Sequence, residues 1–200
     1  MSSEDRRAQI LSTACRLFAE KGYRGVTTRE LASELGVTEP VLYEHFNTKS
    51  DLYRAIIESK ARGGVEVLTG IRDRFHQNPD DLGFFQALAE SILFWYSGDP
   101  DFIRLLLFSN LENHELKDLF HERTEDCFQI VCGYISRRQV DGTIRRDLNP
   151  AVAARGFFGM VAHYCLTAVI FQVSPIPKPP VEVIQEMVRI FVTGMSNQEQ

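Results

Sequence analysis

The 200-residue sequence lacks the features that mark secreted proteins, metalloproteins and most enzymes. Its cysteines show neither C-x-x-C spacing nor a histidine at a metal-ligand interval, and the N-terminus has no apolar signal region. No G-x-S-x-G element, phosphate loop or pair of catalytic carboxylates in a catalytic context is present. We therefore expect that the protein is not an enzyme and that it binds no cofactor or metal. We expect the thiols to be small buried groups in a protein of a reducing compartment, at Cys15, Cys127, Cys132 and Cys165.

The sequence also lacks a surplus of positive charge, since its net charge is −5. The charge is unevenly divided, however. Residues 1–62 hold ten Lys or Arg against nine Asp or Glu, whereas the remaining residues hold twelve against eighteen. Because the acidic surplus lies outside the N-terminal part, the composition does not exclude a DNA contact there, but such a contact must depend on local geometry.

One stretch, residues 156–177, contains no Asp, Glu, Lys or Arg and is long enough to span a bilayer. His163, Gln172 and Pro175 interrupt it, and we expect its helix to end near Phe171. We interpret the stretch as a helix buried on several sides by protein. The expected protein is therefore cytoplasmic, with no membrane partner.

Strand signals are weak and helical spacing dominates, which predicts an all-α fold of about nine helices. In Asn78-Pro79, Asp99-Pro100 and Asn149-Pro150 a capping side chain precedes a proline suited to a first helical turn. Residues 174–180 are too rich in proline for a helix. The predicted helices cover 5–21, 28–35, 39–46, a segment from Thr48 into the 60s or 70s, segments starting near 80, 100, 114 and 150, and 181–196.

The most informative segment begins with Thr27-x-x-Glu30, a capping box that predicts a helix start. Leu31 and Leu35 lie one turn apart and should face a core. Gly36 follows directly, where a left-handed residue is least costly. The pattern predicts a short helix with a sharp turn after it.

A second short helix should follow the turn, with Thr38 available as its cap and Pro40 in its first turn. Leu42 and Phe46 lie one turn apart and can anchor it. A helix of about eight residues is marginal alone, but one held by its neighbours can enter a major groove. The alternative is a plain helical hairpin. The outward side presents Glu39, Pro40, Val41, Tyr43, Glu44 and His45.

The run Leu-Tyr-Glu-His-Phe-Asn-Thr-Lys-Ser-Asp-Leu-Tyr at 42–53 resembles the signature of the TetR family of transcriptional regulators. The run Ala-Cys-Arg-Leu-Phe-Ala-Glu-Lys-Gly-Tyr-Arg-Gly from Ala14 is similar to that family's first helix and turn. The resemblance is specific over about residues 8–57, and beyond them it rests on helix count and the G-x-I-R-x-D-L-x-P element at 142–150. It implies a helix-turn-helix domain at 1–48 and a ligand-binding and dimerisation domain at 49–200.

The resemblance also implies roles for individual residues at a double-stranded DNA operator. Phosphate contacts would come from Thr27, Thr28, Tyr43 and Lys49, whose hydroxyls and ammonium are suitable donors. Arg29 would reach a guanine edge. For His45 the alternative is a surface or packing role. For Glu44 two alternatives stay open, a hydrogen bond accepted from cytosine or a side chain that points away from the bases. The base-facing residues would be Thr38, Glu39, Pro40, Val41 and His45.

In TetR-like proteins the second domain surrounds a small-molecule effector that shifts the fourth helix and separates the recognition helices. The resemblance implies the same here, with a small, largely apolar or aromatic effector that releases a repressor from a palindromic operator. For each aromatic residue the alternative is ordinary core. The candidate effector-binding residues are Phe85, Trp95, Phe102, Leu106, Cys127, Phe128, Tyr134, Phe158, His163 and Tyr164.

Two apolar helices, expected at 150–171 and 181–196, predict a homodimer with a four-helix interface. The pairs His114-Glu115 and His121-Glu122 do not match H-E-x-x-H and favour a solvated helix surface over a metal site. Two other function classes stay open from the residues alone. They are an enzyme without a known motif and a helical interaction module that has lost DNA binding.

Overall fold

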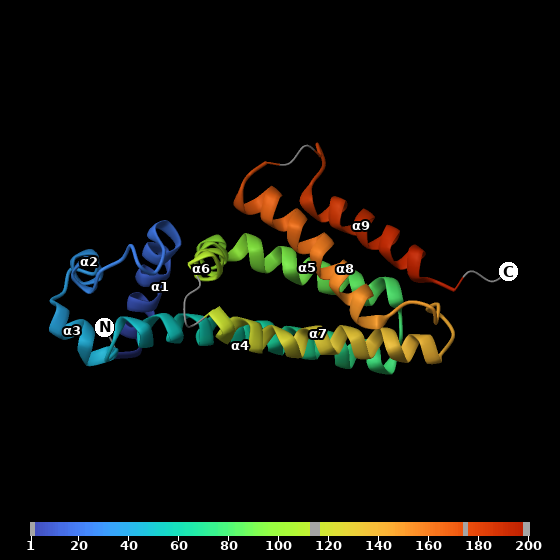
Figure 1. The fold of residues 1–200 in the computed structure, drawn as a ribbon, viewed down its shortest axis with the longest axis horizontal. Helices are drawn as coiled ribbons and strands as arrows, with labels where there is room; N and C mark the ends of the chain where they lie inside the picture. Colours follow the sequence, from blue (N-terminus) through green and yellow to red (C-terminus); the bar gives the residue numbers. More distant parts are fainter. Residues whose placement is uncertain (1–2, 113–116, 174–175, 198–200) are drawn as a thin grey trace. The chain divides into compact units, whose positions relative to one another are not determined.

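The computed structural model describes residues 3–112, 117–173 and 176–197, and over these residues it confirms the all-α prediction. Within them it has nine α-helices and no strand (Figure 1). The predicted start near residue 114 falls outside the described residues. The helices are α1 (Ser3–Lys21), α2 (Thr28–Glu34), α3 (Glu39–His45), α4 (Lys49–Gln77), α5 (Asp81–Gly98), α6 (Pro100–Leu111), α7 (Lys117–Val140), α8 (Pro150–Cys165), which the π-helical turn η1 (Leu166–Ile170) extends, and α9 (Pro180–Met195).

Contacts divide the chain into two compact units, and the long helices α4 and α7 contribute to both. Unit 1 consists of residues 1–63 and 99–123, and unit 2 of residues 64–98 and 124–200. The first half of α4 and all of α6 therefore belong with the N-terminal helices. The functional division at residue 48, implied by the family resemblance, stays a prediction.

Unit 1 is built around buried aromatic rings, with α1 packed against α2 and α6. The Tyr53 ring on α4 meets Phe18 and Tyr23 edge-on, at centroid distances of 5.1 and 5.2 Å. Its hydroxyl donates to the Leu105 carbonyl of α6 at 3.3 Å, and burial raises the pKa of Tyr53 to about 12. This cluster joins α1, α4 and α6 beneath the two short helices.

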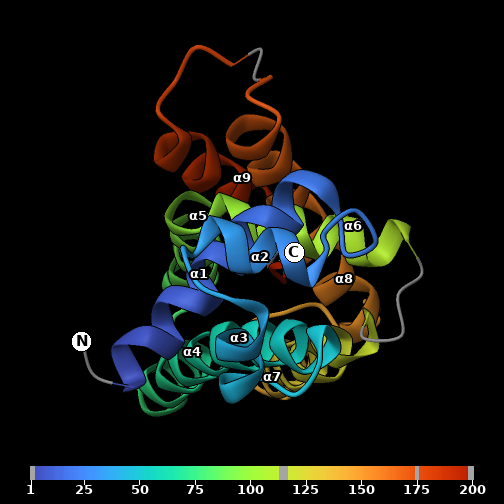
Figure 2. The ribbon, with the colours of Figure 1, turned by 90° about the vertical axis from the view of Figure 1, so that its left-hand side faces the viewer.

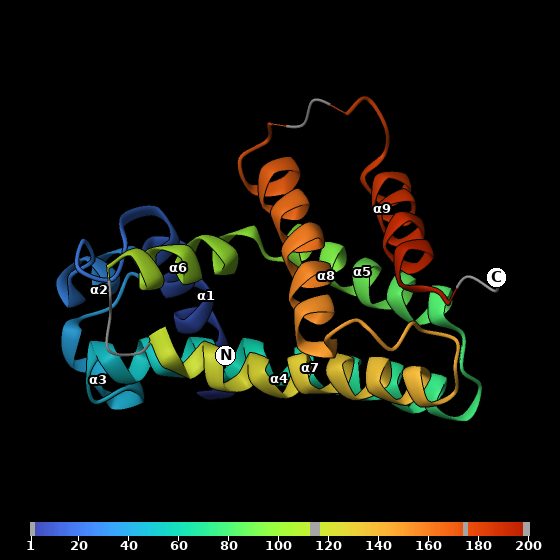
Figure 3. The ribbon, with the colours of Figure 1, turned by 45° about the vertical axis from the view of Figure 1, so that its right-hand side comes forward.

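Unit 2 is centred on α5, against which α8 and α9 both lie (Figure 3). The Phe84 ring stacks on Tyr134 of α7 with a centroid distance of 3.7 Å. Phe85 contacts Phe157 of α8 at 4.9 Å and Phe191 of α9 at 5.2 Å. Aromatic packing of this kind contributes about 0.5–1.5 kcal/mol per pair beyond the area buried. These rings form the centre of the apolar core of unit 2.

Two of the three predicted capping pairs act as expected. The Asp99 carboxylate accepts from a backbone N–H at 3.1 Å, and the Asn149 side chain accepts from two, at 2.9 and 3.2 Å. At the third pair the cap is Asp80, which accepts at 3.0 Å, instead of Asn78. The reason is that α5 begins only at Asp81, so Pro79 lies before the cap and not inside the first turn.

The segment Pro150–Ile170 is long and apolar enough to cross a membrane by length and composition, a weak criterion that core helices of soluble proteins also meet. In the structure, Phe157, Val161 and Cys165 on this segment are fully buried in the core of unit 2. One side of the segment is therefore part of this core, whereas Val152, Gly156 and Gly159 are exposed. Burial on several sides, as expected from the sequence, is only partly met.

Candidate nucleic-acid interface

The start of α2 is fixed by the predicted capping box. The Thr27 hydroxyl oxygen accepts a hydrogen bond from the Glu30 backbone N–H at 3.1 Å. The Glu30 carboxylate pairs with the Lys21 ammonium and also accepts from the Thr27 backbone N–H, and these contacts lower the pKa of Glu30. The capping box is confirmed, and the end of α1 is tied to the first turn of α2.

The turn after α2 depends on Gly36, which has a φ of 66°. Its left-handed conformation lets the Val37 N–H reach the Ala32 carbonyl at 2.9 Å, which closes the helix end. Thr38 occupies the cap position of α3, but the prediction that its side chain caps the helix is wrong. Pro40 is the second residue of α3 and has no N–H, so one of the two donors that a cap normally binds is missing.

The two sides of α3 differ in burial. Leu42 and Phe46 are buried in unit 1 together with Leu31 of α2, which anchors the short helix. On the other side Tyr43 is 43% exposed, and Pro40 is exposed too. Figure 2 shows α2 and α3 in succession in a view turned by 90° from Figure 1. A short helix clamped on one side and open on the other is the geometry that major-groove reading requires.

The predicted DNA-contacting residues all lie on α2, on α3 or at the flanking helix ends, where the structure brings them together. The exposed ones are Thr27, Arg29, Thr38, Pro40 and Tyr43. The half-buried ones are Thr28, Glu39, Val41, His45 and Lys49.

Thr28 and Glu39 contact each other instead of standing apart. The Thr28 hydroxyl donates to a Glu39 carboxylate oxygen at 2.8 Å, which links the first turn of α2 to the first turn of α3. In this arrangement the Thr28 proton is directed at a carboxylate. A phosphate contact from Thr28 would need this bond to be exchanged.

Lys49, at the start of α4, is held inside unit 1. Its ammonium donates to the carbonyls of Tyr23 and Val26 at 2.9 and 2.8 Å and lies 4.1 Å from the centre of the Tyr23 ring. Burial lowers the pKa of Lys49, and the nearby Glu112 carboxylate acts in the opposite direction. Glu112 also accepts from the Tyr23 N–H at 3.1 Å. Lys49 therefore fixes the α1–α2 turn, and its phosphate contact stays a prediction.

Arg7 is a residue of this region that the sequence reasoning missed. Its guanidinium donates to the His45 carbonyl at 3.2 Å and lies 4.3 Å from the centre of the Phe46 ring. Arg7 thus covers the C-terminal end of α3 from α1, where a cation is favourable to the helix dipole. No sequence pattern pairs these positions, because they meet only after α1 has packed.

The predicted effector-binding residues do not gather around one described cavity. Phe102 and Leu106 are buried in unit 1, whereas the others belong to unit 2. A cavity of about 610 Å³ lies in unit 2 between the second half of α4 and α7, and of the predicted set only Tyr134 lines it. In unit 2, Phe85, Tyr134 and Tyr164 are buried, Trp95, Cys127, Phe128 and Phe158 are half-buried, and His163 is exposed.

The predicted dimer helices carry exposed apolar side chains. Val152 on α8 and Ile190 on α9 are 70% and 73% exposed. A side chain added at Gly156 or Gly159 of α8 would meet no atom of the chain within 4 Å. These features fit a surface available for close helix packing. Among the described residues no group of His, Cys, Asp and Glu is arranged to hold a metal. His114 and Glu115, and the side chains of His121 and Glu122, lie outside what the structure describes.

Comparison with known proteins agrees with this geometry. The family model of bacterial regulatory proteins of the tetR family matches residues 10–56. The model of the C-terminal domain of AefR-like transcriptional repressors matches residues 99–194. A curated relative, the HTH-type transcriptional activator FasR of Mycolicibacterium smegmatis, is 28% identical over 67% of this chain, a match that spans only 60% of the relative's own length.

Solved structures share the fold. The transcriptional regulator FadR of Bacillus subtilis, in complex with stearoyl-CoA, superposes with a TM-score of 0.71 at 19% identity, covering 94% of this chain and 98% of the other. AibR in complex with isovaleryl coenzyme A and operator DNA gives a TM-score of 0.70 at 23% identity, covering 92% and 97%. The matched families consist of DNA-binding regulators and not of enzymes. With a clamped helix-turn-helix followed by a helical second unit, and with both family models matched in that order, this chain belongs to the TetR family of bacterial regulatory proteins.

Proposed function

We propose that this protein is an effector-responsive repressor that binds a palindromic operator as a homodimer. The single observation that supports this most is α3, whose Leu42 and Phe46 are buried while Pro40 and Tyr43 face outward. Two such helices related by a two-fold axis read two half-sites about 34–36 Å apart. Binding through two short helices at once also raises the effective affinity of each.

The polar residues of the interface support phosphate contacts around α3. Arg29 is exposed, and among the described residues no carboxylate pairs with its guanidinium. Tyr43 presents its hydroxyl on the outer side of α3. We expect Arg29 to read a base edge or a phosphate, and Tyr43 to donate to a phosphate.

Fluorescence anisotropy with fragments of the protein's own promoter region tests this proposal. Wild-type protein should bind one fragment specifically, and Arg29→Ala and Tyr43→Ala should each weaken binding by about tenfold, since a charge-assisted contact contributes about 1.5–3 kcal/mol. Arg189→Ala on α9 removes the same charge from unit 2 and serves as the control. If the wild type binds no promoter fragment specifically, the proposal is refuted, and the protein is a helical interaction module that has lost DNA binding.

The proposal also includes repression as the direction of regulation and the chemical class of the effector. The matched C-terminal model describes repressors and the curated relative is an activator, so a reporter assay with and without the regulator decides between repression and activation. The effector is small and largely apolar. The acyl thioesters of coenzyme A bound by two structural neighbours provide the first compounds to test. A cytoplasmic location is part of the same proposal, because the operator DNA lies there.

A further inference from the structure

The cavity of unit 2 lies between α4 and α7. On each helix the residues that line it recur every three or four positions and so lie on one face. It measures about 610 Å³ and opens to solvent, with Gln129, Gly133 and Arg137 of α7 exposed. This volume lies within the range of about 300–1,000 Å³ that ligand sites occupy. Apolar groups form most of its lining, among them Val65 and Phe75 of α4 and Ile130 and the Tyr134 ring of α7. A site of this size and lining fits a small molecule with a hydrocarbon body.

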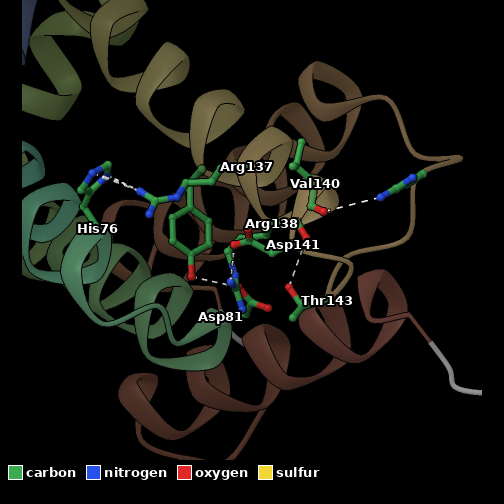
Figure 4. Close-up of polar contacts among 9 residues, drawn as sticks. His76, Asp81, Arg137, Arg138, Val140, Asp141 and Thr143 are labelled. Atoms are coloured by element: carbon green, nitrogen blue, oxygen red, sulfur yellow. Dashed lines mark hydrogen bonds and ion pairs between the residues drawn. The ribbon is translucent and has the colours of Figure 1, made fainter.

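Basic side chains gather at one end of the cavity. His76 of α4 and Arg137 of α7 meet there, and the guanidinium of Arg137 points at the imidazole nitrogens (Figure 4). Arg72 lines the same region, and among the described residues its ion pair is with its exposed neighbour Asp73. An exposed pair of this kind contributes little free energy and is readily exchanged for another anion.

The neighbouring Arg138 is different because its charge is already balanced. Its guanidinium donates to Asp81 at 2.7 Å and to Asp141 at 2.7 Å, and the Tyr134 hydroxyl donates to the same Asp81 oxygen at 2.8 Å. Figure 4 shows this network beside the His76 and Arg137 pair. Arg138 therefore lines the cavity with its charge already balanced by Asp81 and Asp141. Asp126 is the one carboxylate among the described lining residues.

Arg137 has no such partner. Among the residues that the structure describes, no carboxylate lies within ion-pair distance of its guanidinium, which contacts the His76 ring instead. A guanidinium is always charged and only donates, and an imidazole accepts from it only through an unprotonated nitrogen. A carboxylate or phosphate placed between Arg137 and His76 would accept from both.

We propose that this cavity binds an amphipathic anion, with the hydrocarbon body between α4 and α7 and the carboxylate or phosphate held by Arg137 and His76. The ligand class rests on this cavity, and its role as the effector rests on the function proposed above. The site differs from the aromatic set predicted from sequence and shares only Tyr134 with it.

Isothermal titration calorimetry of the full chain with decanoate, decyl phosphate and decanol tests the proposal. At least one of the two anions should bind about tenfold or more tightly than decanol, and comparison of the two identifies the head group. Arg137→Gln should remove that preference, whereas Arg189→Gln, which removes one exposed charge from α9, should keep it. Equal affinity for all three probes would overturn the anion site.

A matched pair of glycine substitutions locates the ligand. Gly133 lines the cavity, and a Cβ atom added there meets no atom of the chain within 4 Å. Gly133→Leu should therefore fill the cavity and abolish binding, while helicity by circular dichroism stays intact. Gly70→Leu is the control, because Gly70 also lies in a helix, has the same free space and does not line the cavity. Binding that survives Gly133→Leu would refute this location.

The regulatory role is measured separately. Saturating amounts of the bound anion should weaken operator binding of the wild type by about fivefold or more and leave Gly133→Leu unaffected. An unchanged operator affinity in the wild type would overturn the effector role. Failure to bind any operator without ligand refutes the proposed function, whereas failure to bind the anions refutes only this inference.

Discussion

Gly36 provides a test of the turn between α2 and α3, because its only structural requirement is its backbone conformation. A side chain added there would meet no atom of the chain within 4 Å, yet φ is 66°. Gly36→Ala therefore costs the left-handed penalty of about 1–2 kcal/mol. Alanine also lowers the conformational entropy of the unfolded chain, which offsets about 0.4–1 kcal/mol of this penalty. We expect a net loss of about 1 kcal/mol, or about 2–4 °C in Tm for a chain of this size.

Gly63 supplies the control, since it lies inside α4 in the same unit and has the same free space. Gly63→Ala should stabilise the protein by about 0.5–1 kcal/mol because alanine favours a helix interior. Gly36→Asn should cost less than Gly36→Ala, since asparagine tolerates the left-handed region. Urea unfolding followed by circular dichroism measures all three. A shift of the same sign for both alanine variants would refute the assignment of the turn.

Three further predictions concern other parts of the chain. Asp81→Asn should lower the free energy of unfolding by about 2 kcal/mol in urea titrations, because the Arg138 side chain it pairs with is only 12% exposed; Asp147→Asn, in an exposed pair, should cost under about 1 kcal/mol. The pKa of Tyr53 is raised from 10.0 to about 12 in the folded protein, so the contribution of its neutral hydroxyl to the free energy of unfolding is complete below pH 10 and is lost as the pH rises toward 12. Between pH 9 and 11.5, the free energy of unfolding of Tyr53→Phe should therefore fall less than that of the wild type. A Cβ atom added at Gly156 meets no atom of the chain within 4 Å, so Gly156→Leu should fold normally, but we expect a monomer in sedimentation velocity; a persistent dimer would contradict the interface on α8.

Much of the local structure could be predicted from the sequence because it depends on residues close together in the chain. Thr27 and Glu30 form their capping box, Asp99 and Asn149 cap the helices they precede, and Gly36 adopts the left-handed turn. Each of these outcomes depends on hydrogen bonds within about four residues. At α5 the capping residue is Asp80 and not Asn78, because the side chain that caps a helix is the one directly before its first turn.

The candidate DNA-contacting residues were found by pattern and resemblance, but their partners were not. Thr28 donates to Glu39, and Lys49 donates to two carbonyls of the α1–α2 turn. These contacts join segments that approach only when the helices pack, so no spacing in the sequence encodes them. The same holds for Arg7 and the end of α3.

The ends of the short helices follow from the residues around them, because capping side chains, proline and glycine act through the adjacent backbone. Which charges are already paired, and where a cavity remains, depends instead on how the helices pack. Arg138 and Arg137 are neighbours in the chain, yet one is balanced by Asp81 and Asp141 and the other faces His76. Packing of α4 and α5 against α7 sets that difference, because an ion pair depends on distance in space and not on separation along the chain.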